Sequence, residues 1–286
     1  MTIDQALDLA VSRLRAGGVD HPPLDAELLL RHVLEWDRAA ILARGGDALS
    51  PRDEVLFFDL VSARARRHPL QHLTGTQAFW RHEFVVAPAV LIPRPETEVL
   101  VEASLRLLEG MTAPRVIDVG TGSGCIALSL AAERPDATLV ATDLSAAALE
   151  IARENASRLG LAGRVRFVRG DLLDAVRSGP GAPMFDLVIS NPPYVHEAEW
   201  RDLAPEVRDH DPRSALVPPG GVAALYARLL AGAARVLCPG GAVAVEVGAG
   251  QSAAVAAQAA GAGFESARTL RDLQDIPRVV VAARPG

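Results

Sequence analysis

Three things are scarce in this sequence: cysteine, an excess of basic residues, and long apolar runs. The two cysteines, Cys125 and Cys238, lie far apart and fit neither a disulfide framework nor the spacing of metal ligands. The seven histidines are scattered as well, so we expect no metal site. Cysteine usage of this kind is typical of a reduced compartment, which predicts a cytoplasmic protein.

The other two absences exclude broad classes of partner. Apolar stretches end at a charge or a glycine before they reach the roughly 20 residues of a membrane span. The start, Met1–Gln5, lacks the basic and apolar regions of a signal peptide. The net charge of −6, from 29 basic and 35 acidic residues, argues against broad binding to a nucleic-acid backbone, which needs a basic face. We therefore expect binding neither to a membrane nor directly to nucleic acid.

The composition is otherwise that of a globular protein, with 49% hydrophobic residues, and the length of 286 residues allows two domains. Residues 1–75 show helical spacing of apolar side chains, which predicts a small helical bundle. Its first helix ends at Gly17-Gly18, the second opens at Pro22-Pro23, the third covers Arg38–Arg44, and the fourth starts at Ser50-Pro51 with Ser50 as its N-cap. The basic stretch 64–67 that follows is interpreted as a solvated face, with contact to a macromolecule as the alternative.

Residues 76–94 change character and predict a linker with a hairpin, in which Phe79-Trp80 and Phe84–Val86 flank a polar turn. A second domain then covers residues 95–286, and its first helix starts at Pro95.

Strands alternate with helices from Arg115 onward, which predicts an α/β domain with a doubly wound, mostly parallel sheet. Residues 196–220, with four prolines, are expected to be irregular, and so long a loop is typically functional. The expected strands are 115–119, 138–142, 165–168, 186–190, 242–247, 264–269 and 278–282, and the helices between them are 123–133, 145–159, 222–237 and 251–260.

A glycine-rich turn, Gly120-Thr121-Gly122-Ser123-Gly124, joins the first strand of this domain to its helix. Glycines there permit a tight turn and close approach of the backbone to a ligand at the helix N-terminus. The pattern differs from the Gly-x-Gly-x-x-Gly of dinucleotide enzymes, which favours a ligand without a pyrophosphate.

Two later strand ends complete the predicted nucleoside site. Asp143 ends the next strand, where a carboxylate can accept both ribose hydroxyls. Asp171 and Leu172 follow the third strand and are placed to reach an adenine edge and face. S-adenosylmethionine fits a site for ribose and adenine, whereas a helix cap or surface acid is the alternative for Asp143 alone.

The most informative stretch follows the strand 186–190: Asn191-Pro192-Pro193-Tyr194. Two prolines make a stiff loop at the carboxyl end of a strand, which is where open α/β sheets bind ligands. The loop offers an amide side chain, the carbonyl of Pro192 and an aromatic ring, a set that suits a planar group carrying an NH2. The alternative is a proline turn with an exposed tyrosine.

With these motifs the chain resembles the class I S-adenosylmethionine-dependent methyltransferases that act on planar amino groups. The stretch Leu91–Glu98 and the helical N-terminal domain make it similar to the HemK/PrmC family, which methylates the glutamine of the Gly-Gly-Gln motif in peptide chain release factors. The resemblance implies a Rossmann-like sheet, S-adenosylmethionine as cofactor, release factors as partners and residues 1–75 as a substrate-docking domain. The sequence departs from the family pattern at Asp211, at Gln274 and at Leu172, where the family often has glutamate, glycine and an aromatic residue.

The resemblance also implies a mechanism. Asn191 Oδ1 and the Pro192 carbonyl are expected to accept the two N–H bonds of the substrate amide and hold its nitrogen in line with the transferred methyl group, while Tyr194 lies against the amide plane. Asn191 is thus expected to contact both cofactor and substrate, and Pro193 the substrate. No base is required before transfer, which leaves His196 without a necessary role. Transfer is expected to be direct, with no cysteine as a covalent carrier.

Three alternatives remain at the level of sequence. Asn-Pro-Pro-Tyr also occurs in adenine-N6 methyltransferases of DNA or RNA, and glutamine methyltransferases of ribosomal proteins form a related group. A protein that keeps the fold and binds a partner without catalysis is the third, although it would have no need of a cofactor site.

Overall fold

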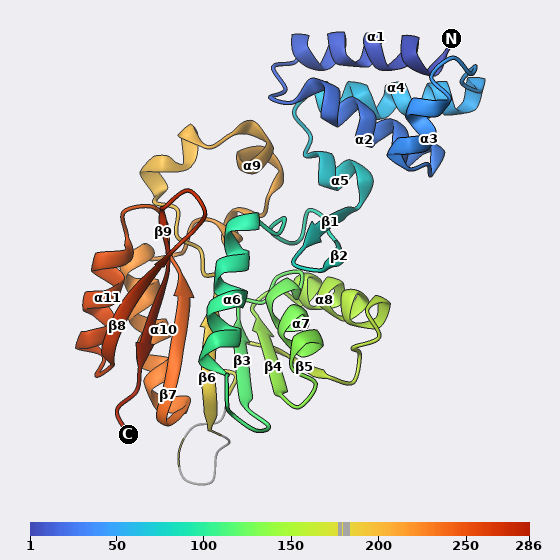
Figure 1. Ribbon diagram of the computed structural model, residues 1–286. Coiled ribbons are helices and arrows are strands. Elements are labelled where there is room, and N and C mark those ends of the chain that lie inside the picture. The colour runs from blue at the N-terminus through green and yellow to red at the C-terminus, as the bar shows by residue number, and fades with distance from the viewer. Residues whose placement is uncertain (177–178, 180–183) are drawn as a thin grey trace. The chain divides into compact units, whose positions relative to one another are not determined.

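The computed structural model describes residues 1–176, 179 and 184–286, and these form two compact units (Figure 1). The first unit comprises Met1–Thr76 together with Leu203–His210, and the second comprises Gln77–Asp202 with Asp211–Gly286. No sequence pattern indicated that residues 203–210 would group with the N-terminal helices.

The first unit is a helical bundle whose helices begin where the sequence supplies caps. Ser50 Oγ accepts a hydrogen bond from the Asp53 amide at 3.2 Å, as expected of an N-cap, and Thr2 forms a capping box with Gln5. Leu29 and Phe57 are among the fully buried side chains of its core. Four of these helices were predicted, and the two short ones, α5 and α9, were not. The helices are α1 (Ile3–Ala16), α2 (Pro22–Leu34), α3 (Arg38–Ala43), α4 (Pro51–Ala65), α5 (Leu70–Thr74) and α9 (Pro205–His210).

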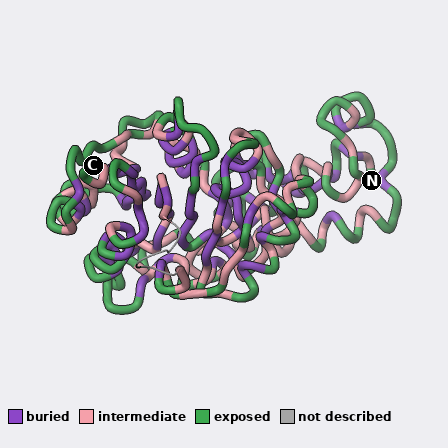
Figure 2. Tube along the Cα trace, turned by 90° about the horizontal axis from the view of Figure 1, so that it is seen from below, coloured by how far each residue is buried: buried purple, intermediate pink, exposed green. Residues whose placement is uncertain are grey.

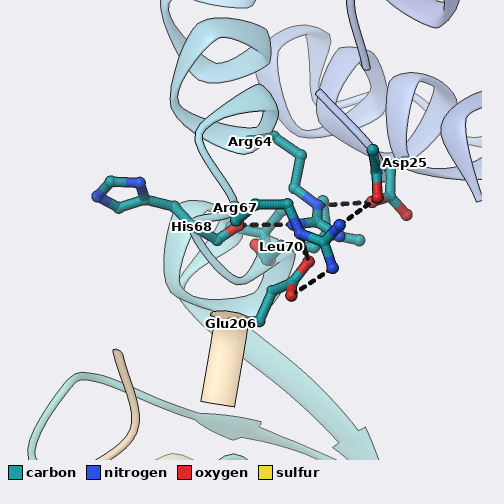
Figure 3. A network of polar contacts seen from close by, with 8 residues as sticks. Asp25, Arg64, Arg67, His68, Leu70 and Glu206 are labelled. Carbon is teal, nitrogen blue, oxygen red and sulfur yellow. Dashed lines mark hydrogen bonds and ion pairs between the residues drawn. The ribbon is translucent and has the colours of Figure 1, made fainter. Parts of the chain in front are cut away.

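The basic stretch 64–67 is not the solvated face that the sequence predicted. Arg64 is buried, with its Nε donating to Asp25 Oδ2 at 2.6 Å and its Nη1 donating to Glu206 Oε1 at 2.8 Å (Figure 3). Arg67 Nη2 donates to the other oxygen of Glu206 at 2.7 Å. Burial by itself would raise the pKa of Glu206, but hydrogen bonds from Arg67 and Arg64 outweigh it and lower that pKa. Helix α9 is thus tied to α4 by charge-assisted hydrogen bonds.

The predicted hairpin is present as the two-stranded sheet of β1 (Thr76–Phe79) and β2 (His82–Val85). Pro95 opens a 3-10 turn, η1 (Pro95–Thr97), from which α6 (Glu98–Leu107) continues. Phe79 and Phe84 pack edge to face, with ring centroids 6.1 Å apart, and belong to the main core of the second unit.

The second unit is built on a seven-stranded sheet with the order β5-β4-β3-β6-β7-β9-β8. Strands β5, β4, β3, β6 and β7 pair in parallel, whereas β9 is antiparallel to both β7 and β8. The doubly wound, mostly parallel sheet predicted from the sequence is therefore confirmed. The strands are β3 (Arg115–Val119), β4 (Thr138–Asp143), β5 (Val165–Arg169), β6 (Phe185–Ser190), β7 (Leu237–Glu246), β8 (Glu265–Arg271) and β9 (Pro277–Ala283).

Both faces of the sheet are covered, which explains why its strands are continuous apolar runs. Alternate residues enter opposite cores: Val116 and Leu187 pack with α6 and α7, whereas Ile117 and Val188 pack with α10 and α11. All residues of β3 but Arg115 and all residues of β6 but Asp186 are consequently buried. Figure 2 draws buried residues in purple. The remaining helices are α7 (Cys125–Glu133), α8 (Ala146–Arg158), α10 (Val222–Val236) and α11 (Ser252–Gly261).

The segment 196–220 is less irregular than its prolines suggested. It contains two 3-10 turns, η2 (Glu197–Asp202) and η3 (Arg213–Ala215), on either side of α9. These three elements are too short for the spacing of their apolar residues to predict them from the sequence.

Among the described residues, no helix combines the length and apolarity needed to cross a membrane. The same residues contain no group of three or more His, Cys, Asp or Glu side chains that could hold a metal ion.

Candidate active site

The carboxyl ends of four adjacent parallel strands, β5, β4, β3 and β6, bring the predicted site residues to one edge of the sheet (Figure 1). Val119, the last residue of β3, is in register with Thr142 on one side and with Ser190 on the other. The glycine turn, Asp143 and Asn191 each follow one of these three paired residues. The edge is held together by Ser190 Oγ, which donates to the Val119 carbonyl at 2.7 Å.

The glycine turn has the backbone conformation that only glycine adopts readily. The φ angles of Gly120, Gly122 and Gly124 are +73°, +56° and +82°. A Cβ at Gly120 or Gly122 would meet no atom within 4 Å, so the turn presents open space to a ligand. A Cβ at Gly124 would lie 3.0 Å from Leu128 Cδ1, which shows that this glycine serves close packing of the helix instead.

Asp143 is oriented by the turn that it faces. Its Oδ2 accepts from the Gly122 amide at 2.9 Å, and its Oδ1 accepts from the Ser145 amide at 2.8 Å. Each carboxylate oxygen has a second lone pair, so both remain able to accept a hydroxyl. The two hydrogen bonds therefore fix the orientation of the carboxylate and leave it able to accept further hydrogen bonds.

Beneath the turn lies Asp118, which the sequence analysis did not single out as a site residue. Its Oδ2 accepts from Thr121 Oγ1 at 2.6 Å, and the Ala127 backbone amide also interacts with its buried carboxylate. Burial raises the pKa of Asp118 to about 7, against the lowering effect of the Thr121 hydroxyl. A second unpredicted residue, the buried Asn155, donates from Nδ2 to the Ser123 carbonyl at 2.9 Å. Asp118 therefore holds the side chain of Thr121, and Asn155 holds the backbone of the glycine turn.

The two residues predicted for the adenine differ in their surroundings. Asp171 is exposed, and its Oδ2 accepts from Arg228 Nη2 at 2.7 Å. Leu172 has a φ of +49° and packs partly buried against the same apolar cluster as Tyr194. The structure thus gives Leu172 an inward position and Asp171 an ion pair at the surface.

Asn191 is oriented by a residue from a distant part of the chain. Its Nδ2 donates to Thr97 Oγ1 at 3.1 Å, and Thr97 is buried at the junction of η1 and α6. No donor within the described residues reaches Asn191 Oδ1 or the carbonyl of the buried Pro192. The two predicted acceptors for a substrate amide are therefore present and unpaired in the described chain.

Tyr194 is held at both ends. Its hydroxyl donates to Glu246 Oε1 at 3.3 Å, and its carbonyl accepts from Gln251 Nε2 at 2.8 Å. Burial raises the pKa of Tyr194, and the charge of Glu246 raises it further, so the phenol is neutral. Glu246, the last residue of β7, is only 1% exposed, and burial raises its pKa to about 7. His196 is exposed, and within the described residues no hydrogen bond joins its ring nitrogens to this network, so its lack of a role stays a prediction.

Comparisons with known proteins agree with this geometry. Residues 5–75 match the PrmC N-terminal domain family, and residues 96–222 match the methyltransferase small domain family. A release factor glutamine methyltransferase from Moorella thermoacetica is 45% identical over 287 residues, covering 99% of each chain, and one from Deinococcus radiodurans is 43% identical over the whole of each. This chain belongs to the release factor glutamine methyltransferase family. The predicted resemblance is confirmed.

The fold is shared more widely than the family. The crystal structure of a methyltransferase from Pyrococcus furiosus matches with a TM-score of 0.52 at 18% identity, covering 73% of this chain and 92% of that one. At this identity the likeness concerns the methyltransferase fold, which is the class predicted from the sequence.

The departures from the family pattern have a structural setting. Asp211 is buried beside Arg94, whose Nη2 donates to Asp211 Oδ2 at 2.7 Å, and this pair ties the stretch 91–98 to the segment that follows α9. Burial raises the pKa of Asp211 to about 6, although Arg94 opposes the shift. Gln274 lies in the exposed turn between β8 and β9, where its backbone amide donates to Asp272 Oδ1 at 2.9 Å.

Proposed function

We propose that this protein transfers a methyl group from S-adenosylmethionine to the side-chain amide nitrogen, N5, of the glutamine in the Gly-Gly-Gln motif of peptide chain release factors. The observation that carries the proposal is the orientation of Asn191. Its amide NH2 is engaged by Thr97, which leaves Oδ1 and the neighbouring Pro192 carbonyl as paired acceptors beside the glycine turn.

The residues around the turn fit S-adenosylmethionine. The open space over Gly120 and Gly122 accommodates a ligand close to the backbone, and the braced Asp143 offers acceptors for ribose hydroxyls. Thr121, Ser123 and Gly124 complete the turn, while Asp171, Leu172 and Asn191 are the further residues that would contact the cofactor. When bound, the cofactor supplies an electrophilic methyl group on a sulfonium.

The chain's own residues supply orientation. A carboxamide nitrogen is a weak nucleophile because its lone pair is delocalised, so catalysis must come from positioning and from favouring the charge that develops on nitrogen. Asn191 Oδ1 and the Pro192 carbonyl would each accept one N–H of the substrate amide. Tyr194 would lie against the amide plane, with Pro193 keeping the loop stiff. A nitrogen that has gained the methyl group is acidic enough to lose its proton without a dedicated base.

The same proposal assigns substrate docking to the N-terminal helices. All the cofactor and amide residues lie after residue 90, whereas residues 5–75 match a domain family of their own. A protein substrate needs a larger contact surface than an amide site provides. A cytoplasmic location belongs to the proposal too, because both cysteines of the chain are free.

The experiment is transfer of a labelled methyl group from S-adenosylmethionine to purified release factor. A release factor in which the Gly-Gly-Gln glutamine is replaced by glutamate is the matched control, since it keeps the backbone and removes the amide. Single-stranded DNA and RNA oligomers test the adenine alternative in parallel. Label on release factor that requires the glutamine supports the proposal, whereas label on an oligomer with none on release factor would overturn it.

A further inference from the structure

A chain of polar contacts runs behind the Asn-Pro-Pro-Tyr loop and joins three elements of the second unit. Asn191 Nδ2 donates to Thr97 Oγ1 at 3.1 Å, the Thr97 hydroxyl interacts with the carboxylate of Glu246, and Tyr194 donates to Glu246 Oε1 at 3.3 Å. Thr97 and Glu246 are 2% and 1% exposed, so this chain is shielded from water. The mechanism described above uses Thr97 only as the partner of the Asn191 amide and gives Glu246 no role.

The directions of these hydrogen bonds are coupled. A hydroxyl has a single hydrogen, and an ionised carboxylate can only accept. If the Thr97 hydrogen points to Glu246, then only lone pairs of Thr97 Oγ1 are left for Asn191. Asn191 must then present its NH2 to Thr97, and its Oδ1 is turned toward the opposite side.

The carboxylate has the capacity that this arrangement needs. Glu246 Oε2 is buried and accepts no hydrogen bond of regular geometry within the described residues, although Thr97 lies close enough to lower the pKa of Glu246. A buried acceptor without a donor is costly, and rotation of the Thr97 hydroxyl supplies one. We assign the Thr97 hydrogen to this carboxylate.

We propose that Glu246, acting through Thr97, is the positioning residue that fixes the amide orientation of Asn191, so that Oδ1 and not Nδ2 faces the substrate amide. The inference rests on the proposed function, because it concerns the residue assigned there to hold the glutamine. A flipped Asn191 would turn its own NH2 toward the substrate NH2, and both groups are donors. The substrate NH2 would then lose one of its two acceptors.

The arrangement requires an ionised carboxylate. A protonated Glu246 can donate to Thr97, which then donates to Asn191 Oδ1 and favours the flipped amide. Burial raises the pKa of Glu246 to about 7, so ionisation falls within the working range of pH. The charged and titratable groups around it are Glu96 beside Thr97, Arg278 on β9, Tyr194 on the loop, Tyr226 on α10 and Cys125 on α7.

The primary test compares Glu246→Gln with the wild-type enzyme in release factor methylation. Glutamine keeps the shape but can present either a donor or an acceptor to Thr97, so the orientation of Asn191 is no longer unique. We expect kcat to fall between about 10-fold and 100-fold, the scale of loss for a misplaced reacting group, with little change in KM or in cofactor affinity. The wild-type kcat should rise with pH through an apparent pKa near 7, and the Glu246→Gln profile should be flat.

A second pair of variants keeps the carboxylate and changes its partner. Thr97→Val preserves shape and removes the hydroxyl, whereas Thr97→Ser retains it. We expect Thr97→Val to lose kcat as Glu246→Gln does and Thr97→Ser to keep most of it. In the Thr97→Val background, Glu246→Gln should have little further effect, because both changes break the same connection.

Tyr194→Phe tests the other contact of Glu246, because it removes the hydroxyl that donates to the carboxylate and keeps the ring. If it reproduces the whole loss of Glu246→Gln, the carboxylate acts through Tyr194 and the inference is overturned. The inference also fails if wild-type enzyme methylates release factor and Glu246→Gln matches its kcat and pH profile. Absence of any methylation by the wild-type enzyme would instead contradict the proposed function itself.

Discussion

At the scale of single residues, Asp143 is the proposed ribose partner, and its two oxygens accept the Gly122 and Ser145 amides. Asp143→Ala should weaken S-adenosylmethionine binding by roughly 1–3 kcal/mol, the usual cost of leaving buried polar partners unmatched, while the protein stays folded. Calorimetric titration measures the affinity, and circular dichroism checks the fold. Asp171→Ala is the comparison, because its carboxylate is exposed and paired with Arg228, and it should weaken binding less. Unchanged affinity in Asp143→Ala would mean that the ribose lies elsewhere.

Glu246 gives a stability prediction whose sign differs from that of its effect on activity. Burial raises its pKa from an ordinary 4.5 to about 7, so the folded protein binds this proton more tightly than the unfolded chain does. The contribution of Glu246 to the free energy of unfolding is therefore greatest at low pH and is lost as pH rises from about 4.5 to 7.

Glu246→Gln removes this dependence. The free energy of unfolding of the variant minus that of wild type should be larger at pH 8 than at pH 5. Urea unfolding at both pH values measures this difference. Other buried acids, such as Asp118 and Asp211, titrate in both proteins and cancel in the comparison. A constant difference between variant and wild type across this range would contradict the assignment of a raised pKa to Glu246.

The candidate site residues were indicated by motifs that are local in sequence, whereas residues that reach the site from distant elements were not. Glycine and proline determine which backbone conformations are accessible in two such motifs, Gly120–Gly124 and Asn191–Tyr194. Both motifs lie where strand ends were expected. Thr97 and Glu246 matter because they meet Asn191 and Tyr194 from elements far away in sequence. The one available signal was an acid at the end of the apolar strand 242–247, a position at which a buried carboxylate needs partners.

At the scale of elements, α9 is held by the two arginines of α4 more than by apolar packing. Its residues are not buried, yet Glu206 accepts from both Arg64 and Arg67 (Figure 3). Glu206→Gln removes the charge that both guanidinium groups share. Hydrogen exchange of the backbone amides in residues 203–210 should become faster as the segment opens more readily.

The matched control is Glu197→Gln, which breaks the exposed pair with Arg213 in η2 and η3. Exposed pairs contribute about 0–1 kcal/mol, so exchange around η3 should change little. Equal exchange rates in residues 203–210 of wild type and Glu206→Gln would show that these ion pairs do not hold α9.

Long periodic elements followed from the sequence, and short or bent ones did not. The helices of 1–65 and strand β3 agree with the expected ranges within a few residues, because their apolar spacing is regular. Strand β7 begins at Leu237, five residues before the predicted start, since the segment Pro239-Gly240-Gly241 reads as a turn but forms an irregularity within the strand. The helices α5 and α9 each span fewer than two turns and carry no detectable period.

At the scale of the whole molecule, the proposed division of labour predicts that catalysis and docking separate. A chain beginning at Gly75 should still bind S-adenosylmethionine, because the glycine turn, Asp143 and Asn191 all lie in the second unit. It should lose most of its activity on intact release factor, expressed as kcat/KM. Normal kcat/KM in this shortened chain would refute the docking role of the N-terminal helices.

The division of the chain was only partly visible in sequence. The change of character at residue 76 indicated the end of the helical domain, but the hairpin expected as a separate linker, residues 76–94, belongs to the second unit, which begins at Gln77. That residues 203–210 belong with the first unit depends on Arg64, Arg67 and Glu206, whose separation of about 140 residues leaves no pattern for a single sequence to show.

The central claim is that the Asn-Pro-Pro-Tyr loop holds a glutamine amide for methylation, and its most direct test is mass-spectrometric mapping of the methyl group on release factor treated with wild-type enzyme, Asn191→Ala and Asn191→Asp. We predict a methyl group on the Gly-Gly-Gln glutamine with wild type, none with Asn191→Ala, and far less with Asn191→Asp, whose carboxylate cannot donate to Thr97. Cofactor binding should persist in all three. Methylation of another residue by wild type, or a normal rate with Asn191→Ala, would contradict the account.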